Sequence, residues 1–166
     1  MYFWDWARSW ADITEQVRNR LITVATTQVR RNDYESIPLS SEFKDIDPIL
    51  FGEILSKISL LSENRLKKGG RKSYDLMVAG YFNDMAKVTK QVYSSLKPDG
   101  QFILVLGDSA PYSVYIPVEE YLGRLGVGLG FQNYKTKIIR KRGEKWEHNS
   151  QRHKIALKES ILFLQK

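Results

Sequence analysis

The fold class of this chain is decided by residues 96 to 109, Leu-Lys-Pro-Asp-Gly-Gln-Phe-Ile-Leu-Val-Leu-Gly-Asp-Ser. The stretch predicts a helix end, a Pro-Asp-Gly turn, an apolar strand at 102–107 and a small polar turn. Because the strand shows no polar alternation, we expect it to be buried on both faces, as a central parallel strand of an α/β sheet. Asp108 and Ser109 follow at its carboxyl end, where open α/β sheets bind ligands. Both are therefore candidate crevice residues, with a turn-capping role as the alternative for Asp108.

The remaining elements follow from the spacing of apolar residues. Steps of three and four positions, typical of amphipathic helices, occur in four segments: 3–24, 48–65, 73–96 and 117–125. Strand patterns occur at 132–141 and 159–164. Asp12 and Glu15 resemble a capping box, while Asp47 before Pro48 is a good start for the second helix. Weak periodicity predicts a loop or irregular insert at 26–46.

The glycine-rich run from Gly126 to Gly130 could be mistaken for a nucleotide-binding loop. Such a loop needs a strand before it and a helix after it. Here the expected order is a helix and then a strand, so we interpret the glycines as the end of a helix.

Composition excludes several classes of site. The chain has no Cys, which rules out a disulfide framework, a Cys-zinc site and a thiol nucleophile. His148 and His153 have no carboxylate at metal-ligand spacing, so we expect no metal site. There is no long apolar run and no signal-peptide pattern. We therefore expect a cytoplasmic protein that has no membrane partner.

The net charge of +7 is local. Residues 133–158 hold nine Lys/Arg and two Asp/Glu, and the other residues hold 17 of each sign. Within this window, cations, amides and a Trp are mixed in a way that fits contact with phosphates and bases. The candidate nucleic-acid-binding residues are Arg140, Lys141, Arg142, Lys145, Trp146, His148, Arg152, His153 and Lys154. The alternative is a solvated surface hairpin.

The order helix, Leu-Lys-Pro-Asp-Gly, apolar strand, helix and closing antiparallel strand pair resembles the second half of class I S-adenosylmethionine-dependent methyltransferases. The wording of Leu96–Asp108 and of the closing stretch Arg152–Leu164 looks most like amino-methylating DNA methyltransferases of restriction–modification type. The aromatic start, Met1-Tyr-Phe-Trp, resembles the segment that follows their catalytic loop. The resemblance implies a partial Rossmann-like sheet with helices and a reversed final strand. On this basis residues 1–72 are a helical amino-terminal segment with an irregular insert, and 73–166 are the carboxyl-terminal half of a methyltransferase-like domain.

The sequence departs from that family at the two loops that carry its chemistry. It has neither a Phe-x-Gly-x-Gly cofactor loop nor a Pro-Pro catalytic loop. We therefore assign no catalytic residue and expect the chain alone to be inactive and to bind S-adenosylmethionine weakly or not at all. The expected partners are DNA and either the missing amino-terminal half or another copy of the chain.

Two other functions stay open from the sequence. The chain can be a non-catalytic nucleic-acid-binding module derived from the methyltransferase fold. It can also be an unrelated small α/β protein that uses its basic hairpin for a phosphorylated ligand.

Overall fold

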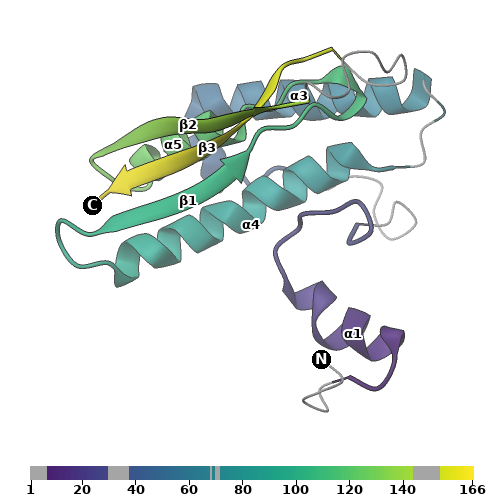
Figure 1. Ribbon diagram of the computed structural model, residues 1–166, viewed down its shortest axis with the longest axis horizontal. Helices are drawn as coiled ribbons and strands as arrows, with labels where there is room; N and C mark the ends of the chain where they lie inside the picture. Colours follow the sequence, from purple (N-terminus) through teal and green to yellow (C-terminus); the bar gives the residue numbers. More distant parts are fainter. Residues whose placement is uncertain (1–6, 30–37, 68, 70–71, 144–153) are drawn as a thin grey trace.

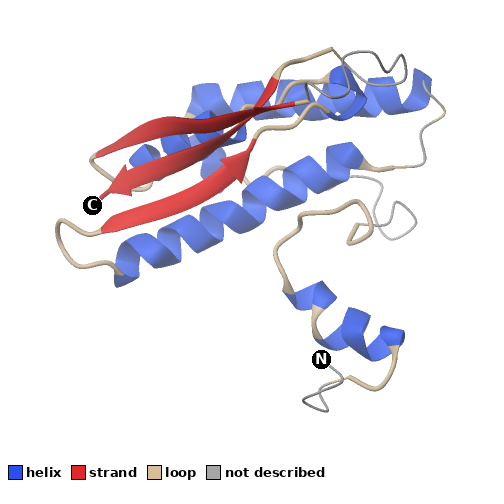
Figure 2. Ribbon diagram, in the orientation of Figure 1, coloured by secondary structure: helices blue, strands red, loops and turns tan. Residues whose placement is uncertain are grey.

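A computed structural model describes residues 7–29, 38–67, 69, 72–143 and 154–166. In chain order its elements are α1 (Trp10–Gln16), η2 (Arg18–Arg20), α2 (Glu42–Ile46), α3 (Pro48–Lys67), α4 (Tyr74–Ser95), β1 (Gln101–Gly107), η3 (Pro111–Ser113), α5 (Val118–Gly128), β2 (Asn133–Arg142) and β3 (Leu157–Gln165). The long helices lie against one side of a twisted sheet, and α1 lies apart from that body (Figure 1; Figure 2).

The sheet has the strand order β1-β3-β2. The last strand, β3, lies between the other two and is antiparallel to both, with Leu162 opposite Leu104 on one side and Thr136 on the other. Because β1 and β2 both oppose β3, they run parallel to each other. The chain is therefore a mixed α/β protein, as predicted, and its closing strand pair is antiparallel.

The position of β1 corrects one prediction. Among the described residues β1 pairs with β3 alone, so it is an edge strand rather than a central parallel one. Phe102, Leu104 and Leu106 pack against the core, whereas the side chains of Ile103 and Val105 are 52% and 69% exposed. The strand is therefore buried on one face only, although its sequence is apolar on both.

The core lies between the helices and the covered face of the sheet. Phe43 and Leu50 of α2 and α3, Phe82 of α4, and Leu162 and Leu164 of β3 belong to one buried cluster. Each such side chain contributes about 1.5–3 kcal/mol through removal of apolar area from water. Residue 72, the predicted boundary between two segments, lies in the connection between α3 and α4, and residues on both sides of it build this core.

The helix ends show which local signals the structure uses. Asp47 caps α3 as expected, because its carboxylate accepts the backbone N–H of Leu50 at 2.8 Å. At the amino terminus the capping box joins Ser9 and Asp12 rather than Asp12 and Glu15. Within the described residues the long helix predicted at 3–24 is reduced to α1 and a short 3-10 turn.

The glycine-rich run ends a helix, as predicted. Gly126 and Gly128 lie in the last turns of α5, and Gly130 has a φ of +115° in the turn to β2. A Cβ atom on Gly126 would lie 2.4 Å from the Leu164 side chain, so this glycine lets α5 approach the sheet closely.

Candidate nucleic-acid interface

The structure describes four of the nine predicted nucleic-acid-binding residues. Arg140, Lys141 and Arg142 form the end of β2, and Lys154 is exposed shortly before β3. The other five, Lys145, Trp146, His148, Arg152 and His153, lie outside the described residues. The structure therefore places the amino-terminal part of the predicted basic segment on a strand.

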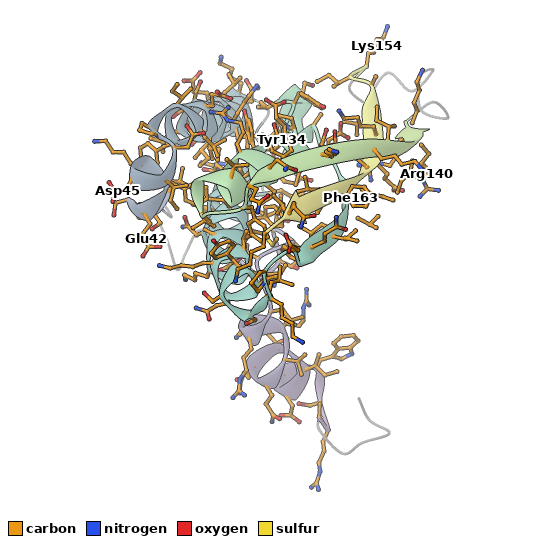
Figure 3. The ribbon with its side chains drawn as sticks, turned by 90° about the vertical axis from the view of Figure 1, so that its left-hand side faces the viewer. Glu42, Asp45, Tyr134, Arg140, Lys154 and Phe163 are labelled. Carbon is orange, nitrogen blue, oxygen red and sulfur yellow. The ribbon has the colours of Figure 1, made fainter. Side chains whose placement is uncertain are left out.

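A column of cations runs along β2 on the face of the sheet that no described helix covers. We call this side the open face. The register places Lys135 beside Phe163, Lys137 beside Ile161 and Arg140 beside Glu159. Arg140 and Phe163 lie on the side of the sheet that faces away from the helices (Figure 3). The open face thus combines this basic column on β2 with an apolar surface on β3 and β1.

A β-bulge keeps the column in line. The pairing of β2 with β3 shifts between Ile138 and Arg140, so Ile139 is an extra residue. Side chains alternate between the two faces of a regular strand, which would place Ile139 rather than Arg140 beside Lys137. With the bulge, Arg140 and Arg142 share the face of Lys135 and Lys137.

Arg140 forms an ion pair with Glu159 of the neighbouring strand β3. Its Nε donates to Glu159 Oε2 at 2.7 Å, and its Nη2 donates to Oε1 at 3.1 Å. The hydrogen bonds from Arg140 lower the pKa of Glu159, and Glu159 in turn raises the pKa of Arg140. The arginine side chain is still 68% exposed, so this surface pair leaves it in contact with solvent.

Arg142 joins the two outer strands. Its guanidinium donates to the carbonyl oxygen of Asp108 and lies 3.7 Å from Glu159 Oε1. It also lies over Gly107, where an added Cβ would be 3.0 Å from the guanidinium atoms. A larger residue at position 107 would therefore require the end of the Arg142 side chain to shift by a few tenths of an ångström.

The carboxylate of Asp108 is buried and hydrogen-bonded within the protein. The residue is 1% exposed, and its carboxylate accepts the Tyr115 hydroxyl at 2.9 Å and the backbone N–H of Lys158 at 2.8 Å. Burial and the hydrogen bond to Asp108 raise the pKa of Tyr115, so this phenol stays protonated and donates. Ser109 is half-buried and pairs through its backbone with Ile116. These contacts join the turn after β1 to β3 and to Tyr115. Neither is made to the backbone of the turn itself, so the turn-capping role and the ligand-binding role of Asp108 both stay predictions.

Lys135 and Lys137 belong to the cationic surface but were not among the residues predicted for it. Both are exposed, and neither forms an ion pair with another described residue. The signal that could have found them is their alternation with Tyr134 and Thr136, which sends their side chains to the face opposite the core. They are the two cations of the column least engaged within the protein.

The part of the chain that the structure describes contains no cluster of His, Asp and Glu that could hold a metal ion. None of its helices has the length and apolar character required to cross a bilayer. Comparison of the chain with protein-family models, curated proteins and solved structures finds no match.

Proposed function

We propose that this chain is the carboxyl-terminal portion of an S-adenosylmethionine-dependent DNA methyltransferase that modifies an exocyclic amine of adenine or cytosine. The observation that carries the proposal is the reversed strand β3, inserted between two parallel strands and directly following the basic segment. This order supports the resemblance that begins at Leu96-Lys-Pro-Asp-Gly.

The chain's own residues do not fit the cofactor. The only glycine-rich run ends α5 and precedes a strand, which is the reverse of a cofactor loop. At the carboxyl end of β1, both carboxylate oxygens of Asp108 already accept hydrogen bonds within the protein. We therefore assign no catalytic step to these residues, and in the proposal the cofactor loop and the Pro-Pro loop belong to the amino-terminal half of the methyltransferase.

The contribution of this chain in the proposal is to hold DNA. Lys135 and Lys137 present exposed ammonium groups, and Arg140 and Arg142 continue this column along the open face to the end of β2. Cations of this kind contact phosphates, which supplies affinity and orientation but no reading of sequence.

The test is a titration of a fluorescent duplex DNA at several salt concentrations. The affinity should fall steeply with salt, with a slope of about −0.9 per phosphate contacted. Replacing Lys135 and Lys137 together by Ala should weaken binding. It should also reduce the magnitude of the salt slope by about 1.8, the value for two phosphate contacts. The matched control replaces Lys90 and Lys97, two exposed lysines outside the column, and should leave both quantities unchanged. Equal effects of the two double variants would contradict the assignment of the open face.

The substitution of these lysines is a cleaner test than that of Arg140 and Arg142. Both arginines contact Glu159 or Asp108, so their replacement would disturb the sheet as well as the cationic surface. A separate calorimetric titration with S-adenosylmethionine should show no heat of binding. Micromolar binding to the isolated chain would refute the statement that it lacks the cofactor site.

A non-catalytic nucleic-acid-binding module is the second candidate function. It is favoured by the cationic column on a chain that lacks a cofactor loop. The two functions differ when the chain is mixed with an amino-terminal methyltransferase half that carries both loops. Methyl transfer to DNA is expected in the first case, and binding without methyl transfer in the second.

A further inference from the structure

The strand β1 itself has none of the charges, prolines or bulges that keep edge strands apart. Its seven residues, Gln101–Gly107, contain no charged side chain and no proline, and its register with β3 is uninterrupted by a bulge. Edge strands are normally protected by charges, prolines, bulges or a covering segment. Among the described residues β1 has no partner on its outer side.

The backbone groups that point outward can be identified. The N–H of Asp108 donates to Lys158, and the carbonyl of Gly100 accepts from Lys166, so even-numbered residues direct these groups toward β3. In an antiparallel ladder the direction alternates along the strand. Residues 101, 103, 105 and 107 therefore direct their N–H and C=O groups to the open edge.

We propose that this edge pairs with the same edge of a second copy of the chain, antiparallel and about a two-fold axis at Leu104. This register is allowed because it pairs odd-numbered residues through hydrogen bonds, Ile103 of one copy with Val105 of the other. It also sets Phe102 of one copy beside Leu106 of the other, and Leu104 opposite itself. Each of these pairs joins two apolar side chains, so the edge is complementary to itself.

The charge distribution permits this pairing. The basic column lies on β2, which is at the opposite edge of the sheet from β1. Pairing of two β1 edges gives the order β2-β3-β1-β1-β3-β2, in which the two columns are five strand spacings apart, about 24 Å. That separation exceeds the screening length of about 8 Å at physiological salt. The net charge of +7 therefore opposes this association only weakly.

The pairing also extends the open face. Ile103 and Val105 are exposed on that face in the single chain. In the pair, Ile103 of each copy lies beside Val105 of the other, which removes part of their apolar surface from water. The proposal concerns this chain in the absence of the amino-terminal half of the proposed methyltransferase, whose strands would add to the same edge of β1. It does not depend on DNA binding or methyl transfer.

The first test is the molecular mass of the chain in solution without DNA, measured by sedimentation equilibrium. The wild-type chain should reach twice its monomer mass, and Val105→Pro should weaken the association at least tenfold. A proline at 105 removes an outward N–H but none of the hydrogen bonds to β3, as edge prolines do. Val105→Thr keeps the N–H and the branched shape and should stay dimeric. A chain that stays monomeric at about 0.1 mM would overturn the proposal.

A second test uses the absence of cysteine from the chain. Leu104 opposes itself across the proposed axis in a non-hydrogen-bonded pair, where Cβ atoms are close enough for a disulfide. Leu104→Cys should therefore cross-link into a covalent dimer under mild oxidation. Ile103→Cys should not, because its counterpart is diagonal to it. Equal cross-linking of the two variants, or a dimer that resists both Val105→Pro and Val105→Lys, would place the association on another surface and refute the pairing.

Discussion

Replacement of Asp108 by Ala tests whether this residue holds the fold or binds a ligand. The buried carboxylate accepts hydrogen bonds from Tyr115 and from the backbone of Lys158, and Arg142 contacts the same residue through its carbonyl. Loss of a hydrogen bond to a charged group costs about 1.5–3 kcal/mol, and more when the donor is left buried without an acceptor. We therefore expect Asp108→Ala to lower the free energy of unfolding by about 3 kcal/mol or more.

The assay is urea unfolding followed by circular dichroism, with a thermal melt beside it. A loss of 3 kcal/mol corresponds to a fall in Tm of about 6–12 °C for a domain of this size. Asp108→Asn keeps the shape but only one of the two acceptor oxygens, so it should lose about 1.5 kcal/mol, roughly half the effect of Asp108→Ala. Asp45→Ala, an exposed carboxylate, serves as the control and should stay within about 0.5 kcal/mol of wild type.

The reasoning is refuted if Asp108→Ala unfolds like the wild-type protein. A variant of unchanged stability that has lost affinity for DNA would assign Asp108 to ligand binding instead. That result would revive the crevice interpretation made from the position of the residue after β1.

Two further predictions concern packing and charge. Gly126→Ala should destabilise the protein by about 1–3 kcal/mol, because the new Cβ would lie 2.4 Å from Leu164. Gly52→Ala, inside α3 with nothing within 4 Å of the new Cβ, should instead stabilise it by up to about 1 kcal/mol, and equal shifts in urea midpoint for the two would contradict the packing argument. Asp47 is subject to a desolvation effect that raises its pKa, but the Leu50 N–H and the Arg124 guanidinium outweigh it and hold the pKa below 3.8. Its charge therefore adds stability above that pH and loses the effect as the pH falls through the folded-state value. Asp47→Asn, which keeps the helix cap, should cost about 0.5–1 kcal/mol at neutral pH and nothing in strong acid, as measured by unfolding across pH.

The middle and end of the fold were predictable from local patterns. Apolar spacing placed a helix at 73–96 and a strand at 159–164, close to the observed α4 and β3. These elements each bury one continuous face, so their periodicity reports their structure directly. The end of α5 at the glycine-rich run followed from the same reasoning.

The predictions that were wrong concern elements whose structure depends on contacts with distant residues. A local sequence pattern does not report such contacts. The apolar run at 102–107 predicts burial on both faces, but the burial of a strand is set by its place in the sheet, and β1 lies at the edge of the described sheet. Helical spacing at 3–24 predicts a long helix, yet α1 buries no residue, and short helices without packing are marginal.

The candidate site was predictable in part. The cations at Arg140–Arg142 were found from charge density alone. Their pairing with Glu159 and Asp108 was not, because these partners come from other strands. Lys135 and Lys137 were overlooked, since alternation marks them as outward-facing but does not say that the outer face is uncovered.

The extra residue at Ile139 has a consequence for how this protein tolerates changes in chain length. Because Ile138 faces Ser160 and Arg140 faces Glu159, a gene that lost the codon for residue 139 would still encode every other pair of this ladder. Loss of the codon for Thr136 would instead move the side chains between that point and the bulge to the opposite face of the sheet. Evolution can therefore shorten β2 by one residue at this position at little cost to the fold. In distant relatives we expect length variation in this strand to be concentrated there.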